Sequence, residues 1–382
     1  GAYTNARPMI QIVYRNQTGI EDYQTYHTQS VGRAGTVYTN DYNGNLVLKH
    51  QDVSTSGNLL PAVVNHVYNT NNKDHDLGYG KGFRINLAQI ISLVKINNVD
   101  YAKYIDEDAT EHYFKREGTS NTYKDEDGLN LTLTLENDVF TMKDKDNNVL
   151  IFQKRTNPNF EKWHLKEMQD AFGNKITLQL NTNTLEDFRI QKVTDGAGDQ
   201  ITFTYDSTSR LSKITDNAGR TVTFNYNSNY NMSKITYHDG KTVTYEYNSL
   251  NLLTGVKNID NSHMNYEYYN EKSNKVKNIK EYSMTNELGK TINISYGNNA
   301  TKFTDNEGYT NTYTFNNFGQ TISIADLGKN SNDMDKALGK MYEYGQEDNN
   351  KNKLTLDGNL MSINEKENNL VENGNFSEGL NH

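Results

Sequence analysis

Apolar and polar residues alternate with a period of two over much of the chain. The segment 221–226 is typical: Val222, Phe224 and Tyr226 fall on one side, while Thr and Asn residues fall on the other. Because successive side chains of a strand point to opposite faces of a sheet, this alternation predicts a half-buried β-strand. The pattern recurs at 201–205, 243–247, 264–268 and 292–296. Each segment predicts a short strand with one aromatic face and one polar face.

These strands belong to an internal repeat. Anchor residues at Gly198, Gly219, Gly240 and Asn261 are 21 residues apart, and looser copies are anchored at Gly173, Gly289 and Gly308. Gly or Asn at an anchor supplies the positive φ that a tight turn requires. A second strand follows each Tyr-Asp or Tyr-Asn pair, so a unit is one β-hairpin. Because one hairpin is marginal in water, we expect the units to join into one long antiparallel sheet, curved by accumulated twist.

The repeat assigns roles to two sets of residues. Asp is suited to the turns because its carboxylate accepts hydrogen bonds from nearby backbone N–H groups. The predicted turn residues are Asp170, Gly173, Asp195, Gly198, Asp216, Gly219, Asp239, Gly240, Asp305 and Gly308. The predicted core residues of the apolar face are Phe203, Tyr205, Phe224, Tyr226, Tyr245, Tyr247, Tyr266 and Tyr268.

The pattern divides the chain into five regions. We expect a leader segment at 1–30, a β-rich region at 31–155, the hairpin repeats at 156–329, a short helix and loop at 330–368, and the start of a truncated further module at 369–382. Asn43-Gly44 predicts a hairpin turn within 35–52. The helix is predicted over 332–344, because apolar residues fall three to four apart there, at Met334, Ala337, Leu338 and Met341. The fold class is therefore all-β, with one short helix near the C-terminus.

Composition agrees with many strands and limits the chemistry. The 382 residues include 27 Tyr and 13 Phe but only 3 Pro, and aromatic residues favour strands. The formal charge of −9 argues against nucleic-acid binding, which needs a basic surface. The absence of cysteine excludes disulfides, thiolate metal sites and cysteine nucleophiles. No apolar run approaches the roughly 18 residues of a membrane-spanning helix. No cofactor is expected.

The repeat resembles that of the Rhs/YD-repeat family of large bacterial surface and toxin-delivery proteins. The resemblance is carried by the segment 210–220, which reads Arg-Leu-x-x-Ile-Thr-Asp-x-x-Gly-Arg, followed by Phe224-x-Tyr226-Asn227, and by its copies. The segments 38–46 and 78–86 resemble the region that leads into the repeats in Gram-positive wall-associated proteins. The segment 373–376 resembles the start of a carbohydrate-binding jelly roll. The resemblance implies a sheet that spirals into a shell around a toxic or variable domain; seven units predict a curved part of such a shell.

Few residues are candidates for chemistry. Paired carboxylates at Asp106/Asp108 and Asp125/Asp127 have the residue types of a glycosidase, but their place in predicted turns favours backbone hydrogen bonding. The loop that begins at Asp144 matches the first ligands of a calcium loop but lacks the Gly at position six and the Glu at position twelve. The nine His show no zinc spacing, and no GxSxG elbow is present. We therefore expect no catalytic residue and no metal.

Two other segments have more than one interpretation. The Gly-dense segment 78–83 does not match a phosphate-binding loop, because neither Lys-Ser nor Lys-Thr follows its last Gly and no helix pattern begins there. Trp163, the one tryptophan, is expected to pack in the core rather than to stack on a sugar.

Three functions remain open from the sequence. The first is a non-enzymatic structural module of a secreted or wall-associated Rhs-type protein, whose partners are other domains of the same polypeptide. The second is an adhesion module that binds cell-surface glycan through aromatic residues out of phase with the repeat, for which Tyr237, Tyr269 and Tyr309 are the candidates. The third, a hydrolase, lacks a recognisable catalytic constellation.

Overall fold

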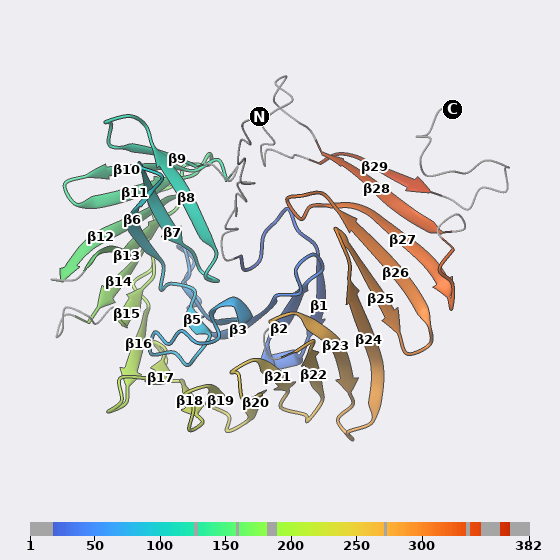
Figure 1. Ribbon diagram of the computed structural model, residues 1–382. Coiled ribbons are helices and arrows are strands. Elements are labelled where there is room, and N and C mark those ends of the chain that lie inside the picture. Colours follow the sequence, from blue (N-terminus) through green and yellow to red (C-terminus); the bar gives the residue numbers. More distant parts are fainter. Residues whose placement is uncertain are drawn as a thin grey trace, which may run out of the picture.

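The fold is described from a computed structural model, for residues 18–125, 129–157, 160–181, 189–270, 273–333, 337–344 and 360–366. In these residues the regular secondary structure consists of antiparallel strands, as Figure 1 shows, together with two 3-10 helices of three residues each. Part of the predicted leader and all of the predicted module at 369–382 lie outside the described residues. The all-β fold class is confirmed.

The first five strands of the chain make up a small sheet. It has five strands in the order β1-β2-β3-β4-β5, each antiparallel to its neighbour. The elements are β1 (Tyr26–Ser30), η1 (Gly32–Ala34), β2 (Thr36–Asn40), β3 (Leu46–Ser54), β4 (Val63–Asn69), η2 (Thr70–Asn72) and β5 (Phe83–Ile85). The turn between β2 and β3 contains Asn43-Gly44, and Gly44 has a φ of 75°.

The large sheet begins with a closed ring of strands. Each strand from β6 to β13 pairs with the next, and β13 pairs back with β6 through Trp163 and His164 opposite Ile91 and Ile90. The strands are β6 (Ile90–Ile96), β7 (Val99–Ile105), β8 (Glu111–Arg116), β9 (Thr122–Asp125), β10 (Thr132–Glu136), β11 (Val139–Lys143), β12 (Val149–Asn157) and β13 (Phe160–Gln169). Trp163 is buried, as expected for a core residue.

The sheet continues from the ring as a row of hairpins. From β13 onward each strand pairs with the next, through to β29. The first eight are β14 (Lys175–Leu180), β15 (Ile190–Thr194), β16 (Gln200–Tyr205), β17 (Leu211–Thr215), β18 (Thr221–Tyr226), β19 (Met232–Thr236), β20 (Thr242–Tyr247) and β21 (Leu253–Lys257). The last eight are β22 (His263–Tyr268), β23 (Val276–Tyr282), β24 (Leu288–Tyr296), β25 (Ala300–Asp305), β26 (Tyr309–Phe315), β27 (Thr321–Lys329), β28 (Leu338–Tyr344) and β29 (Leu360–Lys366).

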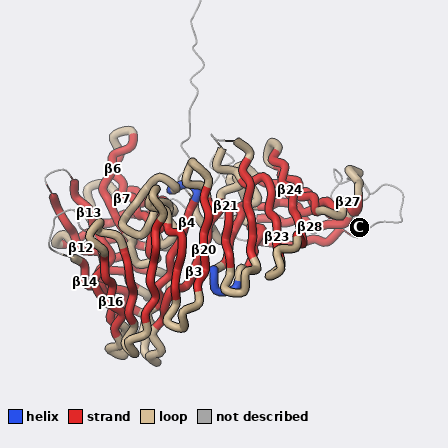
Figure 2. Tube along the Cα trace, turned by 90° about the horizontal axis from the view of Figure 1, so that it is seen from below, coloured by secondary structure: helices blue, strands red, loops and turns tan. Residues whose placement is uncertain are grey.

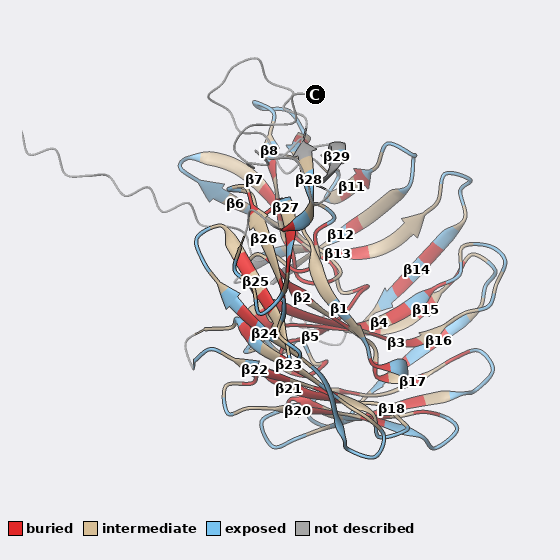
Figure 3. Cartoon of the chain, turned by 90° about the vertical axis from the view of Figure 1, so that its right-hand side faces the viewer, coloured by how far each residue is buried: buried red, intermediate tan, exposed pale blue. Residues whose placement is uncertain are grey.

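The small sheet lies inside the curve of the large one. In Figure 1 the strands from β14 to β27 pass around β1–β5, and Figure 2 shows the same curved wall from below. The aromatic face predicted from the alternation points inward: Phe224 and Tyr245 are buried, and they share one hydrophobic cluster with Val37, Leu48 and Tyr68 of the small sheet. Figure 3 shows buried residues where the strands face the small sheet and exposed ones at the outer turns. One core therefore serves both sheets.

The predicted helix at 332–344 is wrong over the residues that the structure describes. Residues 338–344 form strand β28, which pairs with β27, and the predicted loop that follows includes strand β29. The apolar spacing fits a helix locally, but the edge of β27 presents backbone N–H and C=O groups with which another strand can pair. Gly339 also favours the strand, because a Cβ there would lie 2.2 Å from the Ile324 carbonyl oxygen, which shows how closely the two backbones approach.

One of the looser repeat anchors is also wrong. Gly289 lies within strand β24 rather than in a turn. The residue with positive φ in the preceding turn is Asn286, at 64°. Asn tolerates this conformation better than other residues with a side chain, so it can replace Gly as an anchor. The repeat thus keeps its turn but moves the anchor by three residues.

Candidate functional site: the enclosed face of the repeats

The predicted core residues all lie on the face that encloses the small sheet. Phe203, Phe224, Tyr245 and Tyr266 are between 1% and 7% exposed. The remaining four, Tyr205, Tyr226, Tyr247 and Tyr268, are half-buried and pack against the same cluster. The apolar side of each repeat is therefore covered by β1–β5, a surface that belongs to the same chain.

The half-buried tyrosines form a ladder of hydrogen bonds that the alternation alone does not reveal. Each donates its hydroxyl to a backbone carbonyl fifteen residues earlier: Tyr205 to Ile190 at 2.8 Å, Tyr226 to Leu211 at 2.7 Å, Tyr247 to Met232 at 2.6 Å and Tyr268 to Leu253 at 2.7 Å. A β-bulge immediately before each tyrosine shifts the register of its strand. The tyrosine of each unit thus binds the preceding hairpin to its own.

The predicted turn residues occupy one row of turns. Gly173, Gly198, Gly219, Gly240 and Gly308 have φ values between 76° and 94°. The carboxylates of Asp170, Asp195, Asp216 and Asp305 each accept hydrogen bonds from the N–H groups two and four residues later, at 2.9–3.0 Å. These bonds satisfy backbone groups that the turn leaves unpaired.

Asp239 differs from the other turn aspartates. It directly precedes Gly240 and forms an ion pair with Arg33 of η1 at 2.7 Å. The position that Asp holds in the other turns is taken by Tyr237, whose hydroxyl donates to the Arg33 carbonyl oxygen at 2.7 Å. This turn therefore binds the small sheet, and Tyr237, a candidate for sugar stacking, is buried.

A second row of turns, on the opposite edge of the repeats, contacts the loop before β5 and the side chain of Tyr68 in β4. Leu211 N–H donates to the Gly78 carbonyl at 2.8 Å, and the Lys81 N–H donates to the Tyr230 carbonyl at 3.0 Å. In the next repeat, Leu253 N–H donates to the Tyr68 hydroxyl at 3.1 Å. The Gly-dense segment 78–82 therefore lies along successive turns rather than around a phosphate.

Glycine is required at the closest of these approaches. A Cβ on Gly78 would lie 2.9 Å from the Ser209 carbonyl oxygen, and one on Gly80 would lie 3.1 Å from the Met232 backbone nitrogen. Both glycines also have positive φ, at 89° and 97°. The segment's sequence is thus explained by backbone contact with the repeats.

A buried polar network crosses the interface at its centre. Asp52 accepts from the Nδ1 atoms of His50, at 2.9 Å, and of His66. His50 Nε2 lies 2.6 Å from the hydroxyl of Tyr237, and the side chains of Asp52 and both histidines are fully buried. Burial by itself would raise the pKa of Asp52, but the neighbouring imidazoles of His66 and His50 lower it below its usual range. The carboxylate is therefore charged inside the interface.

Asp108, which is buried, and Asp106, which is half-buried, form a second cluster beside the start of the described chain. Asp108 accepts from the Ile20 N–H at 2.8 Å, and a Cβ on Gly19 would overlap its carboxyl group. Burial, together with the charge of Asp106, raises the pKa of Asp108 to about 8. His112 binds Asp106 at 3.0 Å. Because the chain itself covers Asp108, the pair does not have the open geometry that a glycosidase needs.

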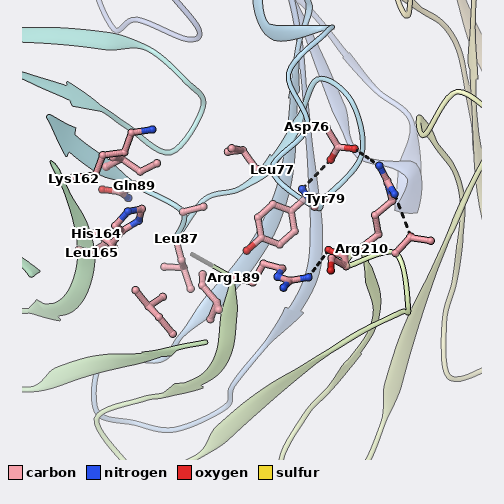
Figure 4. A pocket seen from close by; sticks show the side chains of 17 residues that line it. Asp76, Leu77, Tyr79, Leu87, Gln89, Lys162, His164, Leu165, Arg189 and Arg210 are labelled. Carbon is pink, nitrogen blue, oxygen red and sulfur yellow. Dashed lines mark hydrogen bonds and ion pairs between the residues drawn. The ribbon is translucent and has the colours of Figure 1, made fainter. Parts of the chain in front are cut away.

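A cavity of about 590 Å³ opens where the loop before β6 meets β13 and the repeats, as Figure 4 shows. Lys162, Arg189 and Arg210 bring positive charge to its wall, and Arg210 is paired with Asp76 at 2.8 Å. Burial, with the charges of Arg155 and Lys162, lowers the pKa of His164 to about 3, so its imidazole is neutral at pH 7. The wall suits an anion electrostatically, but its one carboxylate is bound to an arginine and its histidine is a poor base.

The described residues provide little for the other functions that the sequence left open. Tyr269 and Tyr309 are 41% and 48% exposed, but the Tyr269 hydroxyl donates to the Ile294 carbonyl at 2.5 Å. Asp144 accepts from the N–H groups of residues 146 and 148 at 2.8 Å, which occupies the start of the calcium-like loop. Within the described ranges, no group of three His, Asp or Glu side chains has an arrangement that could hold a metal ion. In the same part of the chain, neither helix has the length and apolar character to cross a membrane.

Sequence reasoning missed His50, Asp52 and His66. A signal was present: Leu46, Leu48, His50 and Asp52 follow one another with a period of two, which places two polar residues on the apolar face of a strand. Buried polar residues on such a face must find partners, so the pattern predicts a network there. It does not indicate Tyr237 as the partner, which lies 187 residues further along the chain.

Comparison with known proteins identifies the repeats. The RHS Repeat family model matches residues 189–221 and 205–242, so these residues are Rhs repeats, and the resemblance to the Rhs/YD-repeat family is confirmed there. No curated protein matches the chain.

Several solved structures of toxin complexes are similar to the chain at low identity. The crystal structure of TcdB2-TccC3-TEV is 12% identical with a TM-score of 0.38, over 87% of this chain and 19% of that one. That of TcdB2-TccC3 is 10% identical with a TM-score of 0.38, over 90% and 25%. The Tc holotoxin pore of Photorhabdus luminescens is 12% identical with a TM-score of 0.37, over 87% and 18%. This chain thus spans a quarter or less of the matched chains.

Proposed function

We propose that this chain, an Rhs-repeat protein, is a non-enzymatic structural module whose sheet encloses another part of its own polypeptide. The observation that carries the proposal is the coverage of the aromatic face by β1–β5, through one shared core and through backbone contacts with successive turns. Because each repeat leaves its apolar face uncovered, enclosure is also what makes the repeats stable.

The small sheet is the first occupant of the concave face. It covers the repeats from β15 to about β25, where His27 stacks on Phe303 with ring centroids 3.8 Å apart. Beyond it, at the open end of the sheet formed by β28 and β29, the exposed Leu338 lies on this same face. Leu338 pairs with Asp326 of β27, which pairs with Asn311 of β26, the partner of Phe303, and directly paired residues share a face. We infer that this part forms a wall for a further domain of the same polypeptide, a toxin domain in toxin-delivery proteins of this family. The setting that fits such a module is a secreted or cell-surface protein.

Enclosure can be tested by cysteine labelling, because the sequence contains no cysteine. Val37 in β2 is fully buried against the repeats, and Thr204 in β16 points outward and is exposed. Single variants Val37→Cys and Thr204→Cys change the side chain by similar small volumes. We expect a thiol reagent to modify residue 204 at once and residue 37 only as the protein unfolds.

Similar labelling rates at the two positions would refute enclosure of the small sheet. The non-enzymatic part of the proposal is tested separately, by incubating the full chain with glycan and peptide libraries. Turnover that survives repurification and is lost on substitution of a residue of the chain would refute it. The glycan-binding alternative has less support, because one of its three candidate aromatics, Tyr237, is buried in the interface.

A further inference from the structure

The hydrogen bonds around His50 determine how many protons the network holds. The Tyr237 hydroxyl has one proton, and the carbonyl oxygen of Arg33, 2.7 Å away, can only accept it. The oxygen of Tyr237 must then accept from His50 Nε2, which lies 2.6 Å away. On the other side of the ring, Nδ1 faces the Asp52 carboxylate at 2.9 Å. Both ring nitrogens therefore face acceptors, which requires an imidazolium or an equivalent proton shared with Asp52.

His66 needs no extra proton. Its Nδ1–H donates to the second oxygen of Asp52, and its Nε2 is buried without a hydrogen-bond partner among the described residues. A neutral ring with the proton on Nδ1 satisfies this geometry. The network thus contains one imidazolium, at His50, and one carboxylate, at Asp52. Relative to two neutral histidines and an ionised Asp52 it holds one additional proton, and this proton makes it electrically neutral.

We propose that the interface between the small sheet and the repeats contains a proton-binding site, formed by Tyr237, His50, Asp52 and His66, and that its proton latches the two sheets together. The inference rests on the proposed function, since the latch acts on the enclosed sheet. Three of these residues come from β3 and β4, and Tyr237 comes from a repeat turn, so a proton bound here joins segments almost two hundred residues apart.

Loss of the proton breaks the network at one of three points. A neutral His50 has a single N–H, so together with the Tyr237 hydroxyl it supplies two protons for three contacts. One acceptor among Asp52, Tyr237 and the Arg33 carbonyl is therefore left unpaired, and the charge of Asp52 loses its partner. A second proton is also unfavourable, because it would place an N–H at the unpartnered Nε2 of His66 and a second positive charge in the interface. The latch is therefore strongest at intermediate pH and weakens on both sides.

Other charged groups face the network from the elements packed against it. Arg33 of η1 lies over the Tyr237 ring at 3.7 Å and is neutralised by Asp239. A cavity of about 450 Å³ beside Asp52 and Tyr237 gives protons a route, and the other charged or titratable residues of its lining are Arg33, Lys49, Asp216, Arg220 and His238. Asp216 is held by Arg220 at 2.7 Å, and Lys49 by Glu107 at 2.7 Å. The remaining neighbours are the rings of Tyr79, Phe83, Phe224, Tyr226 and Tyr245. The Asp52 carboxylate is thus the charge that pairs with the added proton.

Two substitutions remove the need for the proton from opposite ends. In Asp52→Asn, the amide can donate to a neutral His50 and accept from His66, so the network is complete without a proton. In Tyr237→Phe, Nε2 of His50 has no acceptor to reach, so a neutral ring suffices. Asp41→Asn is the matched control, because Asp41 is a buried carboxylate that binds His27 at 2.7 Å at another point of the same interface.

The test is hydrogen exchange measured by mass spectrometry on the full chain from pH 5 to 10, corrected for the intrinsic rate. We expect the protection of β3 and β4 in the wild type to fall about tenfold for each pH unit above the pH at which the network loses its proton, a factor of ten per unit being the value for one proton. In Asp52→Asn and Tyr237→Phe this alkaline loss should disappear, whereas Asp41→Asn should retain it. Nitrogen-15 spectra should show both His50 nitrogens protonated at pH 7, with His50→Gln assigning the signals.

Each outcome supports or overturns the latch. A singly protonated His50 at pH 7, or the same alkaline slope in the wild type, Asp52→Asn and Tyr237→Phe, overturns it. Protection of β3 and β4 that is high at every pH would leave the enclosure intact and remove only the latch. Absence of protection in these strands at pH 7 would instead refute the enclosure itself.

Discussion

Two tyrosines at equivalent places in adjacent repeats should respond oppositely to loss of their hydroxyls. Tyr245 and Tyr266 are 21 residues apart, 3% and 1% exposed, and lie on the same face of the sheet. The Tyr245 hydroxyl donates to the Ala34 carbonyl of the small sheet at 2.9 Å. The Tyr266 hydroxyl is buried without a hydrogen-bond partner among the described residues. Shape and burial are thus matched, and only the hydrogen bond differs.

The magnitudes follow from the cost of an unpaired polar group. Tyr245→Phe removes one hydrogen bond and leaves the Ala34 carbonyl buried and unpaired, which should lower the free energy of unfolding by about 1–3 kcal/mol. Tyr266→Phe removes a hydroxyl that is already unpaired, and protein mutational data put the cost of such burial at about 1–3 kcal/mol. This variant should therefore be as stable as the wild type or more stable, by up to about 2 kcal/mol.

Urea denaturation followed by tyrosine fluorescence and far-ultraviolet circular dichroism measures both variants on one scale. An unchanged dependence on urea would show that the compared states are the same. A loss of stability in Tyr266→Phe equal to that in Tyr245→Phe would refute the reasoning, because it would mean that a buried water or another group satisfies the Tyr266 hydroxyl.

Four further predictions follow from the same structure. Phe224→Ala should lower the free energy of unfolding by roughly 3–5 kcal/mol and Thr223→Ala by less than about 1 kcal/mol, and equal losses in denaturant unfolding would show that both faces are covered. Burial raises the pKa of Asp108 to about 8 in the folded protein, against 3.8 for the free group, so the folded state binds more protons than the unfolded state between these values. The free energy of unfolding should therefore fall as pH rises from about 4 to 8. Urea midpoints measured across that range should show a smaller fall in Asp108→Asn. Gly80→Ala should destabilise the protein more than Gly118→Ala, since both have positive φ but only the first meets other atoms within 4 Å, and equal melting temperatures would contradict this. No metal is expected to stabilise the fold, so melting temperatures in EDTA and in millimolar calcium should agree within a few degrees.

The sequence by itself determined the local geometry of the repeats. Alternation of apolar and polar residues specifies which face of a strand is buried, and Gly or Asn at a fixed spacing specifies where the chain turns, because both effects act within a few residues. The spacing of 21 residues therefore predicted the hairpins, the side on which Phe224 lies, and the turn conformation of Gly219. Local information led to a wrong prediction at 338–344, where the residues fit either a helix or a strand. Pairing with β27, which the local pattern does not encode, decided in favour of the strand.

Only the tertiary structure decided what covers the aromatic face. Residues 26–85 fold into a small sheet that packs on strands up to two hundred or more residues away, and no local pattern encodes which distant surface will satisfy an apolar face. The same holds for the polar contacts: Tyr237 takes the place of a turn aspartate because His50 and the Arg33 carbonyl lie beneath it. Apolar burial is not directional, so many surfaces could cover the repeats. The paired hydrogen bonds at the buried interface select this one, since a mismatched partner would leave their donors and acceptors unsatisfied.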